Sequence, residues 1–550
     1  MTKRRFYRWL SRPGHAHPTR PAVTFWRPSS ARDSITYTYG SLFDRVEQLG
    51  EQLSLQHVDQ SSPLGLLLST QEDQVLHYLA ALSAGLVPAI LTPPNPKLNR
   101  AYYQTTMTEV LRRCRFGALI TDVDGVEADC HILEPYTLRS VTSPRQEILS
   151  AETPQPIPVD TSFIQFSSGT TGIKRGVLVS DEAVISQLET YADAVQLSDD
   201  DVIVSWLPLY HDMGFIACLN LPLAFGIHTV MMDPVTWVTN PGHYLQAVTE
   251  HRGTLSWHPN FAYAFMAERA HRDLEEVDLS SVRALVNCSE PATHESQQAF
   301  MDRFRRNGLT KDVFKGCYAM AETTFALTHG EPDDDGALDP EGPENASLPQ
   351  SSAGYVSVGK LLPGVVMKVV NPDDWRELPD RVVGELWVKS PFNFSGYYND
   401  NDATSAAIVD GWYRTGDLGY RAGDNYYIAG RHKDVMIVGG VNVFPQDLED
   451  LVSEVEGVHP GRVAAFSVFD ERMQTERVVV LAETEMQPAA DSNAALVVIR
   501  QRILAAFQIA NFVVKLVPPG WVIKSSSGKV ARSANRDKWL QGEVTASRSS

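Results

Sequence analysis

The sequence predicts an α/β protein in which helices flank parallel sheets. Short apolar runs alternate with amphipathic segments along most of the 550 residues. One unit is complete: the run 162–166 has strand character, a Gly/Ser/Thr loop follows it, and Val184, Leu188 and Tyr191 then repeat at helical spacing. Strand–loop–helix units of this kind build parallel sheets, whose ligand sites lie in loops at the strand ends.

The other elements follow in chain order. Ser180 is the expected N-cap of that helix, because Asp181 and Glu182 would occupy its first turn. The uncharged stretch 214–232 contains Asn, Pro, Gly and His, so it is expected to form a buried helix and strand, not a membrane span. Further buried strands are predicted at 202–204, 284–286, 365–370 and 385–388.

Two breaks divide the chain. Residues 331–349 contain seven acidic residues, no basic residue and four prolines, which is typical of a solvated loop. A second boundary lies near Gly430, and a helix expected to start at Pro445 belongs to a small α+β domain beyond it. The expected parts are a large domain (1–431), a small domain (432–536) and a frayed tail (537–550).

Composition excludes several classes of function. The chain has 48 basic and 67 acidic residues, and its net charge of −19 argues against nucleic-acid binding. Five cysteines without a CxxC pair do not indicate a disulfide framework or a zinc site, and they suit a reducing cytoplasm. The basic N-terminus lacks the apolar run of a signal peptide. A cytoplasmic protein with no membrane span is therefore expected.

The loop 167–176, S-S-G-T-T-G-I-K-R-G, is the first motif whose residues could bind a ligand or take part in a reaction. Small residues let backbone N–H groups approach an anion closely, hydroxyls add donors, and Lys174 adds positive charge. The loop lacks the G-x4-G-K-[ST] pattern of a Walker A motif. Because it follows a strand and precedes a helix, we predict that it binds phosphate. The candidate residues are Ser167, Ser168, Gly169, Thr170, Thr171, Gly172 and Lys174.

This loop resembles the phosphate loop of the adenylate-forming superfamily, which includes acyl-CoA synthetases, peptide-synthetase adenylation domains and luciferases. Five more segments resemble motifs of the superfamily and occur in its order, namely 208–214 (His motif), 318–323 (adenine and magnesium), 413–417 (ribose), 430–434 (hinge) and 526–529 (catalytic lysine). The resemblance covers nearly the whole chain. It implies a large domain of parallel-type sheets and helices, a small β-barrel subdomain, and a small mobile C-terminal domain.

The resemblance also implies a reaction, in which a carboxylate attacks the α-phosphate of ATP and pyrophosphate leaves. Glu322 would ligate Mg²⁺ with help from Thr171. Asp417 would bind both ribose hydroxyls, and Arg431 would assist near the ribose or phosphate. Lys529 would bridge the attacking carboxylate and the α-phosphate, balancing the charge that builds in the transition state.

Further roles follow from the same resemblance. His211 would lie by the reacting carboxyl group. Lys433 would lie at the pivot on which the small domain swings between adenylation and transfer poses. The other expected nucleotide contacts are Ser289, Glu290, Pro291, Cys317, Tyr318, Ala319 and Met320. The expected contacts of the acid substrate are His211, Gly214, Trp257, Asn260 and Phe261.

Three segments indicate a branch of the superfamily. The segment 257–263 is similar to the P-N-F-A-Y signature of fatty acyl-AMP ligases, 287–291 resembles their G-A-E-P turn, and 445–449 resembles their P-x-D-(I/L)-E. These enzymes usually pass the acyl-adenylate to the phosphopantetheine thiol of an acyl carrier protein. The leading hypothesis is therefore a ligase that activates a fatty or related carboxylic acid and loads a carrier protein. The chain has no G-G-D-S-(L/I) carrier motif, so the carrier would act in trans.

Other functions stay open. An acyl-CoA synthetase that uses free CoA is the main alternative. Amino-acid adenylation is less expected, because no counterpart of the Asp that binds an α-amino group stands out. A catalytically silent acyl- or nucleotide-binding module is disfavoured. A protein that had lost catalysis would be expected to have lost Lys529 or Glu322 first, and both are present. Taken singly, His211 and Lys529 could each be structural or idle; only the ordered set favours catalysis.

Overall fold

The computed structural model describes residues 3–548 apart from several short stretches. Those stretches are 29–33, 57, 95–99, 125–130, 134, 136–139, 143–154, 168–173, 271–275, 291, 311, 331–337, 345–353, 439–440, 471–474, 486–488, 508, 510 and 526–527. Most of the predicted acidic loop therefore lies outside the described residues. So do six predicted site residues: Ser168, Gly169, Thr170, Thr171, Gly172 and Pro291.

Two large mixed sheets form the body of the large domain, and most of their interior strands are parallel, as the sequence predicts. The first has the order β14 (Phe314–Cys317), β13 (Ala284–Cys288), β12 (Leu255–His258), β10 (Val202–Ser205), β11 (His228–Met232), β1 (Pro21–Trp26) and β2 (Ile35–Thr38). The second has the order β21 (Gly396–Tyr397), β9 (Gly176–Ser180), β8 (Thr161–Phe166), β4 (Pro88–Ile90), β3 (Leu64–Leu67), β5 (Ala118–Thr121), β6 (His131–Leu133) and β7 (Ser140–Thr142).

Helices cover these sheets, and one large hydrophobic core joins them. The helices are α1 (Arg5–Leu10), α2 (Arg12–Ala16), α3 (Tyr39–Ser54), α4 (Gln71–Ser83), α5 (Arg100–Cys114), α6 (Asp181–Ala194), η1 (Met213–Asn220), α7 (Leu221–Phe225), α8 (Pro234–Thr239), α9 (Gly242–His251), α10 (Asn260–Arg269), α11 (His294–Phe304) and η2 (Arg305–Asn307). Ser180 caps α6 by accepting a hydrogen bond from the Ala183 N–H, which confirms the prediction. The buried succession of η1, α7 and β11 confirms the prediction for 214–232. Across the described part of the chain, every helix is too short or too polar to span a bilayer.

The predicted phosphate loop connects two antiparallel strands, β8 and β9, whereas the sequence predicted a strand followed directly by a helix. The residues 177–179 are consecutive apolar residues that pair with β8, and α6 begins only after them. The helix N-terminus is therefore one strand away from the loop. Anion binding at 167–176 would depend on the loop's own N–H groups and on Lys174, not on a helix dipole.

A smaller antiparallel sheet forms the β subdomain of the large domain. Its strands are β19 (Val366–Val370), β20 (Gly384–Lys389), β23 (Trp412–Ala422), β22 (Ile408–Val409) and β24 (Asn425–Arg431). Short elements surround it: η3 (Ala321–Thr323), β15 (Thr328–His329), β16 (Leu338–Asp339), β17 (Tyr355–Val356), β18 (Lys360–Leu361), α12 (Asn401–Ala407) and η4 (His432–Asp434). The strands β19 and β20 match the two strands predicted there.

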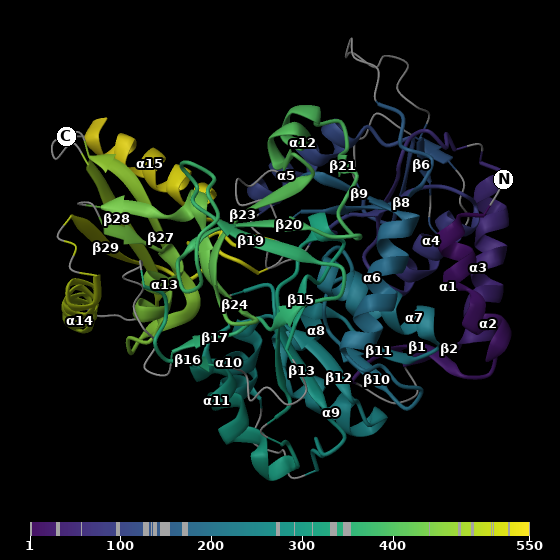
Figure 1. Cartoon of the computed structure of the whole chain (residues 1–550), viewed down its shortest axis with the longest axis horizontal. Coiled ribbons are helices and arrows are strands. Elements are labelled where there is room, and N and C mark those ends of the chain that lie inside the picture. Colours follow the sequence, from purple (N-terminus) through teal and green to yellow (C-terminus); the bar gives the residue numbers. More distant parts are fainter. Residues whose placement is uncertain are drawn as a thin grey trace.

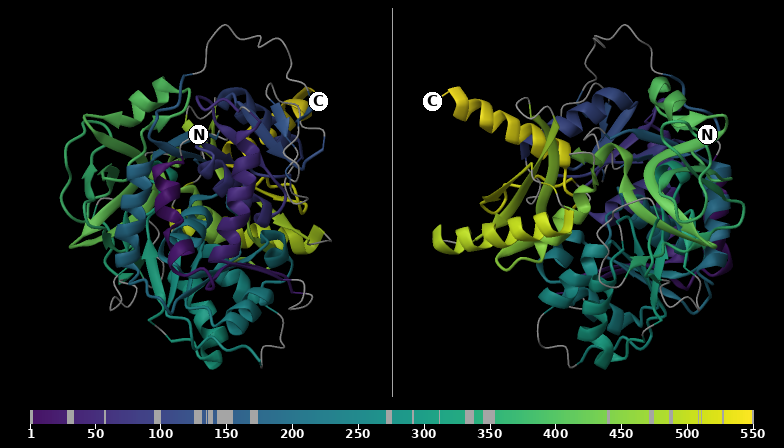
Figure 2. Two further views of the ribbon diagram at one scale, coloured as in Figure 1. Left: turned by 90° about the vertical axis from the view of Figure 1, so that its right-hand side faces the viewer. Right: turned by 60° about the vertical axis from the view of Figure 1, so that its left-hand side comes forward.

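The C-terminal part of the chain has its own hydrophobic clusters. Its elements are β25 (Met436–Val438), β26 (Val441–Val443), α13 (Pro445–Ser453), β27 (Val458–Asp470), β28 (Thr475–Thr484), α14 (Ala489–Phe507), β29 (Phe512–Val517) and α15 (Arg532–Arg548). Figure 1 shows β27, β28 and β29 with α13, α14 and α15 on the left, and the strands of the two large sheets to the right. The stretch from 537, predicted to fray, is helical as far as Arg548, and Figure 2 shows α15 projecting from the body.

Arg532 links α15 and α13 of this C-terminal part to η4, the turn that precedes it. Its guanidinium donates to both carboxylate oxygens of Glu449 in α13 (2.9 and 2.6 Å) and to Asp434 in η4 (2.7 Å). The side chains of Arg532, Glu449 and Asp434 are 20, 11 and 15% exposed. Removing one partner of a buried ion pair leaves an uncompensated charge.

We therefore expect Arg532→Met to destabilise α13 and α15. The free energy of their opening, measured by amide hydrogen exchange, should fall by about 3–5 kcal/mol. Arg502→Met is the control, because Arg502 pairs with Glu454 where both side chains are exposed, and it should change the value by at most about 1 kcal/mol. Equal effects of the two variants would show that the Arg532 network does not stabilise the domain.

Candidate active site

The predicted site residues gather at the carboxyl ends of strands. Ser167 follows β8, His211 lies beyond β10, Phe261 lies beyond β12, Glu290 follows β13 and Tyr318 follows β14. In open α/β sheets this edge is where ligands bind. The topology thus brings together motifs that lie far apart in the sequence.

Lys174 and Ser167 are the described members of the phosphate loop. The Ser167 N–H donates to the Arg175 carbonyl (3.1 Å) and closes the base of the loop. The Lys174 ammonium donates to the Thr92 hydroxyl (2.9 Å) and lies 5.6 Å from the centre of the Tyr210 ring. Burial lowers the pKa of Lys174 to about 8. This cation is therefore desolvated beside the His motif, where it would attract an anionic ligand strongly.

The charge of Lys529, in the small domain, acts on both His211 and Asp212. Burial lowers the pKa of His211 well below its usual value, and the charges of Lys174 and Lys529 lower it further. Burial raises the pKa of Asp212, while its bond from the Met213 N–H and the charge of Lys529 act in the opposite direction. The Nε2 atom of His211 is buried and has no hydrogen-bond partner among the described residues. A neutral imidazole with a free nitrogen is thus available to a ligand at this point.

Gly214 lets η1 approach the preceding loop closely. A Cβ atom at this position would lie 2.5 Å from the Pro208 carbonyl oxygen. Real Cβ atoms do not approach so closely, so a larger residue would push the turn that carries His211 away from the site. Gly214 therefore supports the site through the backbone.

Glu322 is held from three sides. The Tyr397 hydroxyl donates to its Oε1 (2.9 Å), and the Phe394 N–H donates to its carbonyl (2.8 Å). Gln165, the second-last residue of β8, donates from Nε2 to the carbonyls of Ala321 (2.8 Å) and Thr324 (2.9 Å) at the two ends of the turn. Burial raises the pKa of Glu322, and the bond from Tyr397 opposes this shift. The carboxylate is thus fixed relative to the strand that leads into the phosphate loop.

This arrangement fits a Mg²⁺ ion that is held mainly by nucleotide phosphates. Across the described part of the chain, no three His, Cys, Asp or Glu side chains converge into an all-protein metal site. Such an ion takes most of its ligands from phosphate oxygens and water, and it needs only one or two carboxylates from the protein. The buried Glu322 carboxylate, with one oxygen already oriented, can provide one of them. Thr171, the second predicted ligand, lies outside the described residues.

Asp417 and Arg431 contact each other on neighbouring strands. They are paired residues of β23 and β24, and the Arg431 Nε lies 2.7 Å from an Asp417 oxygen. The Tyr318 hydroxyl donates to the other oxygen (2.7 Å), and the Asp417 N–H donates to the Thr415 hydroxyl (3.0 Å). The charge of Asp417 raises the pKa of Arg431. The structure therefore brings the predicted ribose residue, its predicted arginine and an adenine-motif residue into one cluster.

The remaining nucleotide-side residues line the ends of β13 and β14. Cys288 and Cys317 are directly paired across these strands and are buried. Ala319 and Met320 lie in the turn after β14, which is closed by a bridge from Ala319 to Ala326 and a bond from the Met320 N–H to the Phe325 carbonyl (3.0 Å). Ser289 has a positive φ of 72°, which turns the chain sharply after β13.

The predicted acid-side residues have different surroundings. Trp257 is fully buried, and its indole N–H donates to the Tyr191 hydroxyl (2.8 Å). The side-chain oxygen of Asn260 accepts from the side-chain amide of Asn287 (2.9 Å) and from the Thr293 N–H (3.0 Å). The Asn260 side chain therefore links the start of α10 to the end of β13 and the loop after it. Phe261 lies against Trp206 and Trp237, whose rings stack with centroids 3.5 Å apart.

Sequence reasoning missed several residues of this region. Trp206 and Trp237 form the stacked pair, Gln165 and Tyr397 hold the Glu322 turn, and Lys524 contacts Phe261. Each lies far along the chain from its partner and outside a recognisable motif, so no spacing or periodicity signals the contact.

Lys433 lies in η4, between β24 and β25, and its side chain is exposed. Neighbouring Asp434 is bound by Arg532, so this turn is tied to the start of α15. Lys433 thus lies in a short exposed turn between segments that pack into separate hydrophobic clusters.

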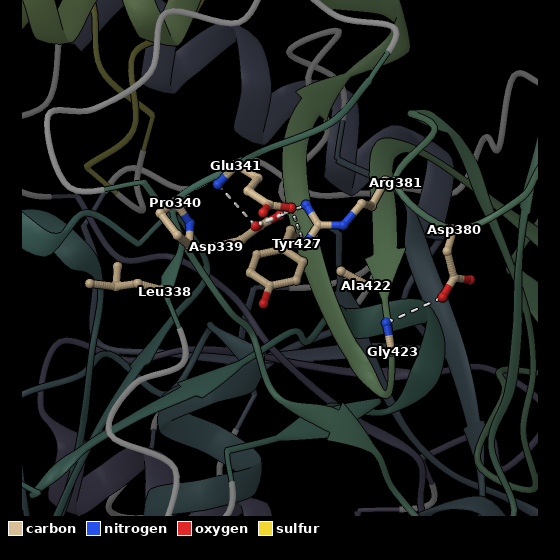
Figure 3. A pocket seen from close by; sticks show the side chains of 9 residues that line it. All are labelled: Leu338, Asp339, Pro340, Glu341, Asp380, Arg381, Ala422, Gly423 and Tyr427. Carbon is tan, nitrogen blue, oxygen red and sulfur yellow. Dashed lines mark hydrogen bonds and ion pairs between the residues drawn. The ribbon is translucent and has the colours of Figure 1, made fainter.

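A separate polar pocket of about 400 Å³ lies at the β23–β24 turn, and none of its lining residues belongs to the predicted site (Figure 3). Its Arg381 pairs with Asp339 (3.0 Å) and Glu341 (3.4 Å), and Asp380 accepts from the Gly423 N–H (3.2 Å). The charged groups of this pocket therefore all have partners, Asp380 through Arg421 outside its lining.

Known proteins have similar sequences and folds over most of this chain. The family model for AMP-binding enzymes matches residues 10–398, and a model for the AMP domain of Disco-interacting protein 2-like proteins matches 433–549. A Caulobacter vibrioides protein named as an acyl-CoA synthetase is 31% identical over 524 residues, covering 92% of this chain and 90% of its own. The medium-chain-fatty-acid–[acyl-carrier-protein] ligase JamA of Moorena producens is 29% identical over 565 residues, covering 96 and 94%.

A solved structure from a study of fatty acyl-adenylate ligases of E. coli and L. pneumophila aligns with a TM-score of 0.83 and 25% identity, covering 99% of both chains. A complex of McyG A-PCP with phenylalanyl-adenylate has the same TM-score at 22% identity, covering 99% of this chain and 84% of that one, and shows the shared fold. The long match to the family model and the shared fold lead to one conclusion: this chain belongs to the AMP-binding enzymes of the adenylate-forming superfamily.

Proposed function

We propose that this chain is an ATP-dependent ligase that converts a fatty or related carboxylic acid into acyl-AMP and transfers the acyl group to the phosphopantetheine thiol of an acyl carrier protein. The observation that supports this most is the cluster of motif residues in which Asp417 accepts from Tyr318 and pairs with Arg431, while the charge of Lys529 in the small domain lowers the pKa of His211. The names of JamA and of the fatty acyl-adenylate ligases support the acid and the carrier.

In the first half-reaction, a carboxylate oxygen attacks the α-phosphorus of ATP. The bond from that phosphorus to the bridging oxygen breaks, and pyrophosphate leaves with the electron pair. Both reactants are anionic, so positioning and charge neutralisation supply most of the catalysis. Lys529 would neutralise charge between the carboxylate and the α-phosphate, and Lys174 would hold the departing phosphates.

The nucleotide would be held by groups that are already oriented. Asp417 would accept hydrogen bonds from the ribose hydroxyls, with Tyr318 and Arg431 keeping its carboxylate in place. Mg²⁺, when bound, would neutralise phosphate charge, and Glu322 is the described residue that would hold it. Neutral His211 would lie by the carboxyl group and could accept or donate one hydrogen bond without adding charge.

In the second half-reaction, the thiolate of the carrier attacks the acyl carbonyl, the C–O bond to AMP breaks, and AMP leaves. Because Lys529 is assigned to the first half-reaction, we infer that the small domain, from residue 432, swings away before the thiol approaches. Four of the five cysteines lie among the described residues, and all four are free thiols, which favours a cytoplasmic location for this chemistry.

Replacing Lys433 by Pro tests the pivot. Because Pro fixes φ near −65°, the turn should lose the freedom that the swing needs. Transfer from preformed acyl-adenylate should slow more than carboxylate-dependent ATP–pyrophosphate exchange, and Lys433→Ala should leave both rates near wild type. Unchanged transfer in the Pro variant would place the pivot elsewhere.

The acyl acceptor needs its own test, because the Caulobacter relative is named as an acyl-CoA synthetase. Purified protein with ATP and a panel of carboxylic acids should first be assayed for pyrophosphate release. Adding carrier protein should then yield acyl-carrier at low concentrations of carrier, while free CoA should compete poorly. Efficient acyl-CoA formation with no transfer to any carrier would favour the CoA-dependent function instead.

A further inference from the structure

The segment that carries Lys529 is a tight hairpin with a second lysine at its other arm. Lys524 and Val530 form a β-bridge, the Ser525 N–H donates to the Lys529 carbonyl (2.7 Å), and the Ala531 N–H donates to the Ile523 carbonyl (3.0 Å). The two lysines are therefore fixed relative to each other.

The hairpin is also fixed to the small domain. The Asn535 side chain, at the start of α15, accepts from the Ile523 N–H (2.8 Å) and donates to the Ile523 carbonyl (2.9 Å). Asn535 is fully buried. The Lys524–Val530 bridge and the backbone bonds beside it thus link the position of Lys524 to that of Lys529.

Lys524 makes its contact with the large domain. Its ammonium lies 5.8 Å from the centre of the Phe261 ring, at the start of α10. The Phe261 N–H donates to the Glu290 carboxylate (3.1 Å), so an aromatic ring and a carboxylate form one docking surface. Burial lowers the pKa of Lys524 to about 8; Arg462 lowers it further, while Glu290, Glu483 and Glu449 act to raise it.

This contact differs from the other lysine–aromatic contacts of the small domain. Lys515 lies over Trp539 (5.0 Å) and Lys538 lies over Trp521 (3.9 Å), so both stay inside the domain. Only a contact that crosses the domain boundary changes when the small domain moves.

We propose that Lys524 is a positioning residue that holds the small domain in the adenylation pose by docking on Phe261 and Glu290. The role rests on the proposed two-step function, in which Lys529 must first approach and then leave. Lys524 itself does not touch the reacting atoms. A cation–π contact of the usual strength would favour the docked pose by about 2- to 30-fold.

Lys524→Met tests this role, because Met keeps most of the aliphatic stem and loses the charge. We expect pyrophosphate exchange to fall by about 2- to 30-fold, while transfer from preformed acyl-adenylate is unchanged or faster. Lys524→Arg should restore exchange, since a guanidinium also stacks on an aromatic ring. Lys515→Met, the matched control, removes a lysine–aromatic contact that lies within the small domain and should leave the ratio of the two half-reactions unchanged.

A pair of fluorophores can measure the fraction of molecules in the docked pose, a quantity that would not change if Lys524 only stabilised the fold of the small domain. Fluorophores placed on exposed positions of α11 and α14 report the fraction of molecules in the docked pose with ATP and acid bound. Lys524→Met should lower this fraction and Lys515→Met should not.

The proposal is overturned if Lys524→Met leaves both the docked fraction and the exchange rate at wild-type values, or if it slows both half-reactions equally. If wild-type protein shows no exchange with any acid, the proposed function fails, and the docked fraction measured with ATP alone still decides the role of Lys524.

Discussion

Replacing Lys529 by Ala is expected to reduce formation of acyl-AMP by a factor on the order of 10²–10³, the usual cost of losing one preorganised charge at a transition state. Lys529 is the small-domain cation whose charge reaches both His211 and Asp212. Transfer from a preformed adenylate should persist, because that step breaks the acyl C–O bond and forms or breaks no bond at the α-phosphorus, where Lys529 is assigned to act. The two half-reactions are measured separately, as pyrophosphate exchange and as thioester formation from synthetic acyl-AMP.

Lys538→Ala is the control for this variant. Lys538 belongs to the same domain, but it stacks on Trp521 and donates to the Trp521 carbonyl (2.6 Å) inside that domain. It should leave the ratio of exchange to transfer unchanged. If Lys529→Ala slowed both half-reactions to the same extent, the lysine would not have the role assigned to it in adenylation.

Replacing Glu322 by Gln should lower exchange by a factor on the order of 10²–10³ at saturating Mg²⁺. Gln keeps the size of the side chain and can still accept the bond from Tyr397, so the change isolates the negative charge. Tyr397→Phe is the graded variant: it leaves the charge and removes the group that orients it, which should cost about 10- to 100-fold in metal affinity or activity.

Binding gives a second measurement for the same pair. Mn²⁺ can replace Mg²⁺ as a paramagnetic probe, so its binding to the protein–ATP complex can be followed without turnover. Its affinity should fall more in Glu322→Gln than in Tyr397→Phe. Wild-type affinity in Glu322→Gln would show that this carboxylate does not hold the metal, whatever happens to the rate.

The sequence predicted the elements whose causes are local. The helix α6 is preceded by its Ser180 cap, β8 is a run of residues with strand character, and α13 starts at a Pro that suits the first turn of a helix. The resemblance assigned Asp417, Arg431 and Tyr318 to the nucleotide, each from a motif of its own, and the structure adds that Asp417 contacts both of the others.

Features that depend on tertiary contacts could not be predicted in this way. The strand β9 pairs through 177–179 with β8, and this run of three apolar residues was too short to distinguish a separate strand from the approach to α6. Tyr397 reaches Glu322 because β21 adds to the far side of β9, a pairing between segments more than two hundred residues apart. The contact of Lys524 with Phe261 depends on how the two domains are placed, which no residue pattern encodes.

The most direct test of the central claim is to look for the mixed anhydride itself. The protein, ATP, Mg²⁺ and a mixture of fatty acids are incubated without a thiol acceptor, and the bound fraction is examined by mass spectrometry. The account predicts enzyme-bound acyl-AMP for at least one acid, which disappears when carrier protein is added and does not form with Lys529→Ala. Hydrolysis of ATP with no acyl-AMP for any acid, or equal amounts of acyl-AMP in wild type and Lys529→Ala, would contradict it.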